Sequence, residues 1–200
     1  MRAFLAIELD TNVREGVAAC QQQLRSHVLT ADPSARVRVS WTALETMHLT
    51  MKFLGEIEEA SASTLERALV PVAGAIGPFT IPLADLGAFP SAREPKVLWI
   101  GPPETWAGTE DAGKLRALHR MLDEAAATIG VARDDRPFNP HLTLARVRDG
   151  SRDLGRLLAA SGALSRPPDV PPLTVCDVVL IKSVLTPTAP QHTVLWRFST

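Results

Sequence analysis

The stretch that decides the fold is MHLTMKFLGE at residues 47–56, and part of it recurs as PHLTLARVRD at residues 140–149. Both stretches contain His-Leu-Thr followed by an apolar residue. Alternate side chains of a β-strand point to the same face. In the first copy this places His48 and Thr50 on one face, with leucine, methionine and phenylalanine on the other. This alternation predicts a strand that is buried on one side.

In the second copy, His141 and Thr143 occupy the corresponding positions, with leucines opposite them. Pro140 directly precedes His141 and disfavours a helix, because proline lacks a backbone donor and has a fixed φ. Each copy therefore predicts an imidazole beside a hydroxyl group. Two unrelated core strands would explain the repeat, and so would one active site assembled from two halves.

The residues that follow the first motif are expected to continue its alternation. Lys52 falls on the face of His48 and Thr50, where we expect an exposed strand lysine. Phe53 falls on the apolar face, which predicts packing in the core.

The composition limits the class of protein. The chain has 200 residues, 46% hydrophobic and 22% charged, which is typical of a globular protein. Its formal net charge of −1 excludes a basic surface field for gripping long nucleic acid, although it allows a local basic patch. No apolar run approaches the roughly 20 residues of a membrane helix, and the first residues lack a signal-peptide pattern. We expect a cytoplasmic protein without a membrane partner, with Cys20 and Cys176 as buried reduced thiols.

Apolar patterns on both sides of the motifs predict further strands and helices. Strands are expected at 2–9, 37–40, 79–86, 96–100, 173–181 and 192–198. Helices are expected from Asp10 or Thr11 to about 32–34, from Ser61 or Ser63 through Leu69, over 109–129, and near 153–160.

The order strand, helix, strand, strand thus occurs about twice, each time with a His-Leu-Thr strand. This predicts an α+β fold that is bilobal and pseudo-symmetric, with two antiparallel sheets facing across a central cleft and helices on the outside. Residues 1–200 are expected to form one two-lobed domain. The sequence contains no heptad pattern, which favours a monomer.

Two such strands across a cleft would bring two imidazoles and two hydroxyls together. Because histidine titrates near pH 6.5, one neutral and one protonated ring can act as general base and general acid. Threonine hydroxyls are suited to phosphate oxygens. A metal site is disfavoured, because neither copy supplies a carboxylate or a third histidine at ligand spacing. The set fits in-line hydrolysis of a phosphodiester, particularly a strained cyclic one.

The chain resembles the two-histidine phosphoesterases, and among them the RNA 2′,3′-cyclic phosphodiesterases of the 2′-5′ RNA ligase family. The resemblance runs in order from residue 2 to residue 198. It rests on RAFLAIEL, WTALETMHLTMKFLGE, LGAFPSAREPKVLWIG, FNPHLTLARV, LIKSVL and HTVLWRF. It implies that His48 and His141 are the catalytic pair and that Thr50 and Thr143 bind phosphate. It also implies a bilobal fold and no metal or other cofactor.

The resemblance further implies that Arg146 helps to hold the phosphate. Strict alternation places Arg146 opposite His141, so this role requires a bulge or strand end between Ala145 and Arg146; otherwise it is a solvated arginine. The family usually has a tyrosine where this chain has His192, which is either a nucleotide contact or a surface histidine. Phe138 flanks the second motif and could stack on a base.

The implied reaction is hydrolysis of 2′,3′-cyclic phosphates, on RNA ends or nucleotides, to 2′-phosphates. Two alternative functions remain open. The same groups could serve as a 2′-5′ RNA ligase or a 2′-5′ oligonucleotide phosphodiesterase. The chain could also be a non-catalytic module that binds RNA ends or nucleotides.

Overall fold

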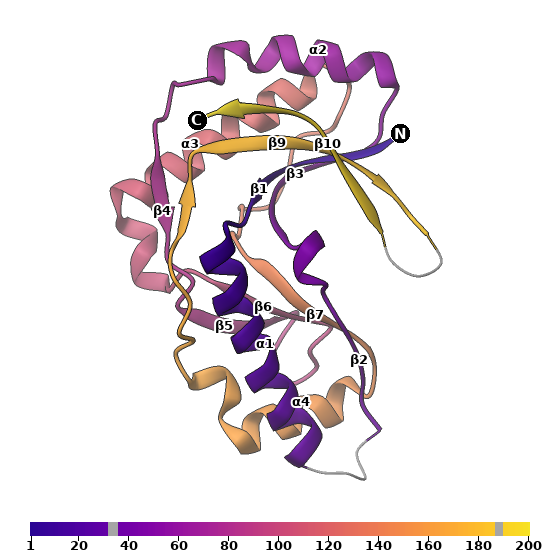
Figure 1. The fold of residues 1–200 in the computed structure, drawn as a ribbon, viewed down its shortest axis with the longest axis vertical. Helices are drawn as coiled ribbons and strands as arrows, with labels where there is room; N and C mark the ends of the chain where they lie inside the picture. Colours follow the sequence, from indigo (N-terminus) through magenta and orange to yellow (C-terminus); the bar gives the residue numbers. More distant parts are fainter. Residues whose placement is uncertain (32–35, 187–189) are drawn as a thin grey trace.

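The computed structural model describes residues 1–31, 36–186 and 190–200, which fold into an α+β protein (Figure 1). The four α-helices of this part of the chain are α1 (Thr11–Ala31), α2 (Glu59–Leu69), α3 (Glu110–Ala127) and α4 (Ser151–Ser161). The strands are β1 (Arg2–Glu8), β2 (Arg38–Trp41), β3 (His48–Glu56), β4 (Phe79–Ile81), β5 (Asp85–Phe89), β6 (Val97–Gly101), β7 (Leu142–Asp149), β8 (Leu173–Val175), β9 (Asp177–Val184) and β10 (Gln191–Ser199).

The main sheet has the strand order β10-β9-β1-β3-β7-β6-β5, with β2 paired to β7, and its described pairings are antiparallel. Strands β4 and β8 form a separate two-stranded sheet. The predicted antiparallel α+β fold is confirmed. The two motif strands, however, do not belong to separate sheets, because Leu49 of β3 pairs with Leu142 of β7 and joins the strands into one path.

In the described ladder, Leu49 and Leu142 are the single residue pair that joins the two motif strands. In Figure 1, β1, β3, β9 and β10 occupy the upper half of the molecule, and β5, β6 and β7 the lower half. Both leucines are fully buried. The junction therefore lies at the residue that follows each motif histidine, which brings the two motifs side by side.

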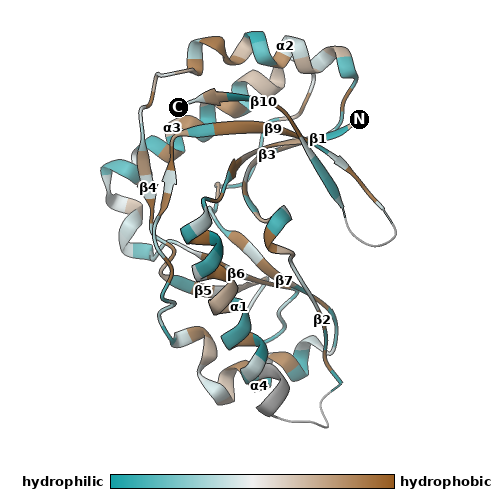
Figure 2. Cartoon of the chain, viewed as in Figure 1, coloured by the Kyte–Doolittle hydropathy of each residue, from teal (hydrophilic) through white to brown (hydrophobic). Residues whose placement is uncertain are grey.

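A continuous hydrophobic core links both halves of the sheet with the helices. Leu5, Leu49, Leu98 and Leu142 belong to the same buried cluster. Helix α1 contacts α4, and α3 contacts α2, β3 and β4. Figure 2 shows hydrophobic residues along the central strands and hydrophilic residues on the outer helices. Burial of this apolar surface is the main favourable contribution to folding.

The first predicted helix begins after its expected capping residue, and the helix predicted over 109–129 has a cap at its first residue. Asp10 accepts a hydrogen bond from the backbone N–H of Val13 at 2.9 Å, and Thr109 accepts one from Ala112 at 3.2 Å. These caps satisfy N–H groups that a helix start leaves unpaired. Helix α2 begins at Glu59, slightly before the predicted serines. The predicted end of α1 at 32–34 lies outside the described residues.

Two predicted strands are each divided in the structure. The stretch 79–86 splits at Pro82 into β4 and the start of β5, which pair with β8 and β6 respectively. Proline cannot donate to a ladder, so a change of sheet there is expected. The stretch 173–181 splits at Cys176 between β8 and β9.

Both cysteines are free as predicted, but only Cys20 is buried. The prediction for Cys176 was wrong, because Leu173 and Val175 of β8 point inward and Cys176, the next residue, falls on the exposed face.

Within the described residues, no helix is both long and apolar enough to cross a membrane.

Candidate active site

A β-bulge follows the motif threonine on β3. The pairing with β1 passes from Thr50 opposite Ala6 to Lys52 opposite Leu5, and Met51 is the extra residue. An extra residue in one strand reverses the alternation of faces beyond it. The prediction for Lys52 was therefore wrong, because its side chain points into the protein and is 2% exposed.

The same bulge explains why the prediction for Phe53 was wrong. Phe53 pairs with Phe4, beyond the bulge, and the two rings lie 6.1 Å apart. Instead of packing in the core, Phe53 is 63% exposed and lines the cleft described below.

Strand β7 carries a bulge at the corresponding position. The pairing with β6 passes from Thr143 opposite Trp99 to Ala145 opposite Leu98, so Leu144 is the extra residue. Beyond it, Arg146 is exposed on the face of Thr143. The predicted bulge is present, one residue earlier than expected. Because both bulges directly follow the motif threonines, Arg146 and Phe53 occupy equivalent positions, three residues after them.

His48 is held by its own strand and by aromatic neighbours. Its Nδ1 lies 2.8 Å from the Thr46 carbonyl oxygen. The ring stacks on Phe4 at a centroid distance of 4.5 Å and an angle of 26°. Burial lowers the pKa of His48 to about 4; the bond to Thr46 opposes this shift and nearby His192 adds to it. The imidazole is therefore neutral at neutral pH.

His141, directly before β7, repeats this arrangement. Its Nδ1 lies 2.8 Å from the carbonyl oxygen of Asn139, again two residues earlier. Phe89 packs against the ring edge-on, at a centroid distance of 5.0 Å. Burial lowers the pKa of His141, the bond to Asn139 opposes this, and Arg146 lowers it further.

These hydrogen bonds fix the tautomer of both rings. A carbonyl oxygen only accepts, so Nδ1 of His48 and of His141 must carry the proton that it donates. In the neutral ring the lone pair then lies on Nε2. Neither Nε2 is hydrogen-bonded to another described residue, so each remains available to accept or, when protonated, donate a proton.

One cleft of about 1150 Å³ contains both motifs. Because Leu49 and Leu142 pair across the junction and point inward, the histidines and threonines beside them share the opposite face. Neither Thr50 nor Thr143 makes a side-chain hydrogen bond to another described residue. All seven predicted site residues line the cleft: His48, Thr50, Phe138, His141, Thr143, Arg146 and His192.

His192 and Phe138 have distinct neighbours in this cleft. His192, on β10, lies edge-on to His48 at 5.4 Å and to Phe4 at 5.2 Å. Burial lowers its pKa. Phe138 stacks on His119 at 4.2 Å, which covers one face of its ring. A third imidazole thus contacts the first motif, and an aromatic ring flanks the second.

Sequence reasoning missed the aromatic residues that hold the imidazoles. Phe4 lies in an otherwise unremarkable apolar strand, and Phe89 ends β5. Only the strand pairing brings them next to the motifs. The registers Phe4 opposite Phe53 and Glu8 opposite His48 place Phe4 on the motif face of β1.

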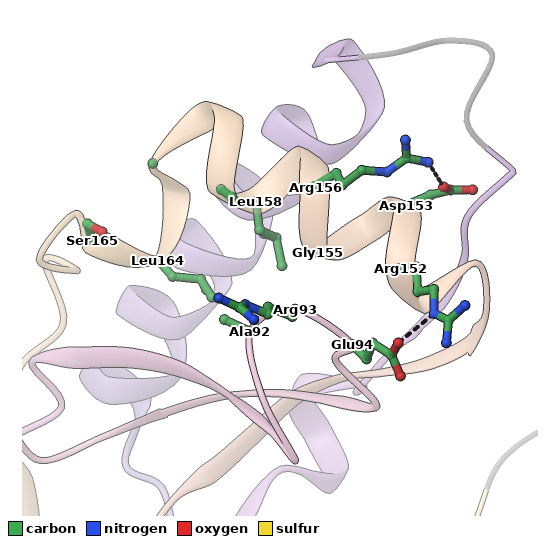
Figure 3. Close-up of a pocket in the computed structure, with 12 residues that line it drawn as sticks. Ala92, Arg93, Glu94, Arg152, Asp153, Gly155, Arg156, Leu158, Leu164 and Ser165 are labelled. Carbon is green, nitrogen blue, oxygen red and sulfur yellow. Dashed lines mark hydrogen bonds and ion pairs between the residues drawn. The ribbon is translucent and has the colours of Figure 1, made fainter.

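The arginines around the second motif lie in two separate places. Arg133, Arg136, Arg146 and Arg148 line the cleft. A separate hollow of about 650 Å³ lies beneath α4, and Arg152 and Arg156 belong to it (Figure 3). There Arg152 pairs with Glu94 at 2.5 Å, and Arg156 with Asp153. Acidic and basic side chains are thus mixed at this hollow, and no motif residue lines it.

Across the described parts of the chain, no three His, Cys, Asp or Glu side chains are grouped as metal ligands would be. A reaction without a metal stays a prediction.

Two His-Leu-Thr strands on one cleft of an antiparallel α+β fold define a class, the two-histidine phosphoesterases. A family model described as the 2′-5′ RNA ligase superfamily matches residues 10–186. The chain therefore belongs to the 2′-5′ RNA ligase superfamily.

Among its relatives, a protein of Methanothermobacter thermautotrophicus is 32% identical over 195 residues, covering 96% of this chain and 95% of its own length. One from Archaeoglobus fulgidus is 30% identical over 194 residues, covering 96% of each. Both are named RNA 2′,3′-cyclic phosphodiesterase.

Solved structures show the same fold. E. coli LigT, crystallised with 3′-AMP, superposes with a TM-score of 0.68 at 26% identity and covers 99% of this chain and 96% of its own. A Thermus thermophilus protein gives a TM-score of 0.64 at 28% identity, covering 100% of this chain and 97% of its own. The predicted family is confirmed.

Proposed function

We propose that this protein hydrolyses the 2′,3′-cyclic phosphate of RNA ends or nucleotides to a 2′-phosphate, with His48 and His141 as its catalytic pair. The observation that carries the proposal is the matched geometry of the two rings. Each donates through Nδ1 to the carbonyl two residues earlier, at 2.8 Å, and leaves Nε2 free in one cleft. The curated relatives of M. thermautotrophicus and A. fulgidus carry the name of this activity.

The reaction needs one proton acceptor and one proton donor. The neutral imidazole removes a proton from water through Nε2, and the water oxygen forms a bond to phosphorus. The bond from phosphorus to O3′ breaks, and the protonated imidazole donates its Nε2 proton to O3′. The products are a 2′-phosphate and a 3′-hydroxyl. Each positioned acid or base contributes about 10²- to 10⁴-fold in rate.

The threonines and Arg146 are proposed to hold the phosphate. The hydroxyls of Thr50 and Thr143 share the motif face with the imidazoles and are suited to non-bridging oxygens. The Arg146 guanidinium, brought to that face by the bulge at Leu144, can stabilise the charge that builds up in the transition state. No metal or other cofactor takes part in this scheme.

The nucleoside is proposed to lie against the aromatic side of the cleft. Phe53 is exposed there, and Phe138 has one face covered by His119. A base stacked on such a ring gains about 1 to 3 kcal/mol. His192, beside His48, is proposed as a further nucleotide contact. The E. coli LigT structure with 3′-AMP shows that a relative of the same fold binds a nucleotide.

We propose that the whole chain acts as one two-lobed domain and works as a cytoplasmic monomer. The halves that carry β3 and β7 are proposed to be the lobes, with the cleft between them. The core cluster shared by both halves supports a single unit, because separate domains would each bury their own core.

The superfamily name favours a related second activity. If a ribose 5′-hydroxyl replaces water, the same pair of imidazoles would join two RNA ends through a 2′-5′ bond. A non-catalytic binding module would not require two rings with the same fixed tautomer.

The first experiment is to incubate the protein with 2′,3′-cyclic CMP and with a short RNA that ends in a cyclic phosphate, in the presence of EDTA. We expect the 2′-phosphate isomer, at a rate that EDTA does not change. His48→Ala and His141→Ala should each lower kcat by about 10²- to 10⁴-fold. Arg152→Ala, at the separate hollow, is the matched control and should keep full activity. A folded wild-type protein without turnover would contradict the proposal.

A sulfur-substituted substrate assigns the two roles. A cyclic phosphate with sulfur in place of O3′ has a leaving group that needs no protonation. The alanine variant of the acid should recover most of its rate on this substrate, and the variant of the base should not. Recovery by both variants, or by neither, would contradict an acid and base pair.

A further inference from the structure

A charged cluster lies at the edge of the cleft, around the buried side chain of Lys52 that the bulge turns inward. The ammonium group of Lys52 lies 2.5 Å from Oδ1 of Asp123 and 2.9 Å from Oδ1 of Asp134. It also donates to the carbonyl oxygen of Ala132 at 2.8 Å. The three protons of the ammonium thus have three oxygen acceptors, so the buried charge is fully satisfied.

The three acceptors come from two parts of the fold. Asp123 belongs to α3, whereas Ala132 and Asp134 belong to residues 131–140, called here the approach segment, which lead directly to His141. The backbone N–H of Asp134 also donates to Oδ1 of Asp123 at 3.2 Å. Lys52 of β3 therefore ties the approach segment to both a helix and a motif strand.

The approach segment has little else to hold it. It forms no helix or strand, and most of its residues are exposed. Residues 132 to 139 make no backbone–backbone hydrogen bond to another described residue. Farther along, Phe138 stacks on His119, which itself lies 3.4 Å from Asp134. The described interactions that hold the segment therefore all involve side chains. The side chain of Lys52 lies at their centre.

This segment carries groups that the proposed reaction needs. The carbonyl oxygen of Asn139 accepts the proton of His141 Nδ1, which fixes the orientation and tautomer of that ring. Arg133, Arg136 and Phe138 line the cleft. A displacement of the segment would therefore move the catalytic ring, and a misplacement of about 1 Å costs on the order of 10²-fold in rate.

We infer that Lys52, with Asp123 and Asp134, is a positioning residue: its ion pairs hold the approach segment so that the Asn139 carbonyl orients His141. This inference rests on the proposed function for its kinetic consequence. The orientation of His141 is a structural property that can be measured by itself. Lys52 is among the residues that line the cleft, but Asp123, Asp134 and the Ala132 carbonyl take up its three protons, so it acts through the segment.

The test is Lys52→Met, which keeps the length and apolar character of the side chain and removes its charge. We expect kcat on 2′,3′-cyclic CMP to fall by about 10²-fold, since His141 loses its fixed position. By ¹⁵N nuclear magnetic resonance, the His141 ring should change from the Nδ1-protonated tautomer to a mixture. Lys182→Met is the matched control, because Lys182 pairs at the surface with Glu59 at 3.2 Å. It should change neither quantity.

A second pair of variants separates positioning from stability. Asp134→Asn keeps the shape of the side chain and removes one of the two carboxylate charges, so it tests the inference if Lys52→Met does not fold. Its kcat should fall by about tenfold, in line with a smaller displacement. Val17→Ala shortens a buried side chain of α1, far along the chain from the segment. It should lower the midpoint of thermal unfolding while leaving kcat per folded molecule unchanged.

Two outcomes would overturn the inference. In the first, Lys52→Met and Asp134→Asn behave like Val17→Ala, with lower stability but wild-type kcat. In the second, His141 keeps a single tautomer in both variants. Absence of turnover in the wild-type protein would contradict the proposed function alone, because the tautomer of His141 would still decide the role of Lys52.

Discussion

The buried position of His48 predicts a specific loss of stability in acid. Its pKa is lowered to about 4 in the folded protein, chiefly by burial, from an ordinary value of 6.5. Between these two values the unfolded chain binds a proton that the folded protein does not. The free energy of unfolding must therefore fall as the pH falls through this window.

The size of the effect follows from the two pKa values. The full shift corresponds to about 3 kcal/mol. Between a pH of about 7.5 and a pH of about 5, linkage gives a loss of about 2 kcal/mol from this one ring. His119 and His141 also have lowered pKa values, so the wild-type protein loses more in total.

The variant His48→Asn isolates the contribution of His48. Its amide can still donate to the Thr46 carbonyl oxygen, but it does not titrate. Urea unfolding of both proteins at the two pH values gives the difference. We expect the wild-type protein to lose about 2 kcal/mol more than the variant on acidification. Equal losses in the two proteins would refute the reasoning, as would a titration of His48 near its ordinary pKa by nuclear magnetic resonance.

Three further predictions follow from the structure. Because burial lowers the pKa of both motif histidines and the reaction needs one of them protonated, kcat/KM for a cyclic nucleotide should be highest below pH 6.5 and decline above it; a maximum at alkaline pH would contradict this. Gly155→Ala should destabilise the protein by more than about 2 kcal/mol in urea unfolding, since its Cβ would lie 2.1 Å from the Arg93 carbonyl oxygen. Gly113→Ala, also in a helix but with nothing nearer than 3.9 Å, is the control and should stabilise by up to about 1 kcal/mol; the same sign for both would rule out this explanation. Phe53→Ala should lower kcat/KM for RNA substrates by about 5- to 150-fold with little change in stability, because the ring is 63% exposed; unchanged kinetics would remove Phe53 from the site.

Local sequence patterns were sufficient to predict most of the helices and strands. They also predicted that an imidazole lies beside a hydroxyl group in each motif. The alternation around His48 and His141 identified two strands, each with an imidazole beside a hydroxyl. The capping residue Asp10 located the start of the first helix, because a cap depends only on neighbours a few residues away. The same motifs indicated the family.

The features that only the tertiary structure decided depend on contacts between residues that are far apart in the chain. The bulges at Met51 and Leu144 are visible only in the register with β1 and β6, and each reverses the faces beyond it. For this reason, strict alternation misplaced Lys52 and Phe53 and left Arg146 undecided. The joining of the halves at Leu49 is likewise a non-local pairing.

The sequence by itself thus determined which residues carry the chemistry, because residue type and short-range periodicity are local properties. The tertiary structure decided which way the side chains beyond each motif point and what holds them there. A single extra residue in a strand changes the face of every residue after it, and only the partner strand shows whether that residue is extra. The acceptors of Lys52 lie on α3 and the approach segment, so its burial was decided by packing rather than by its own strand.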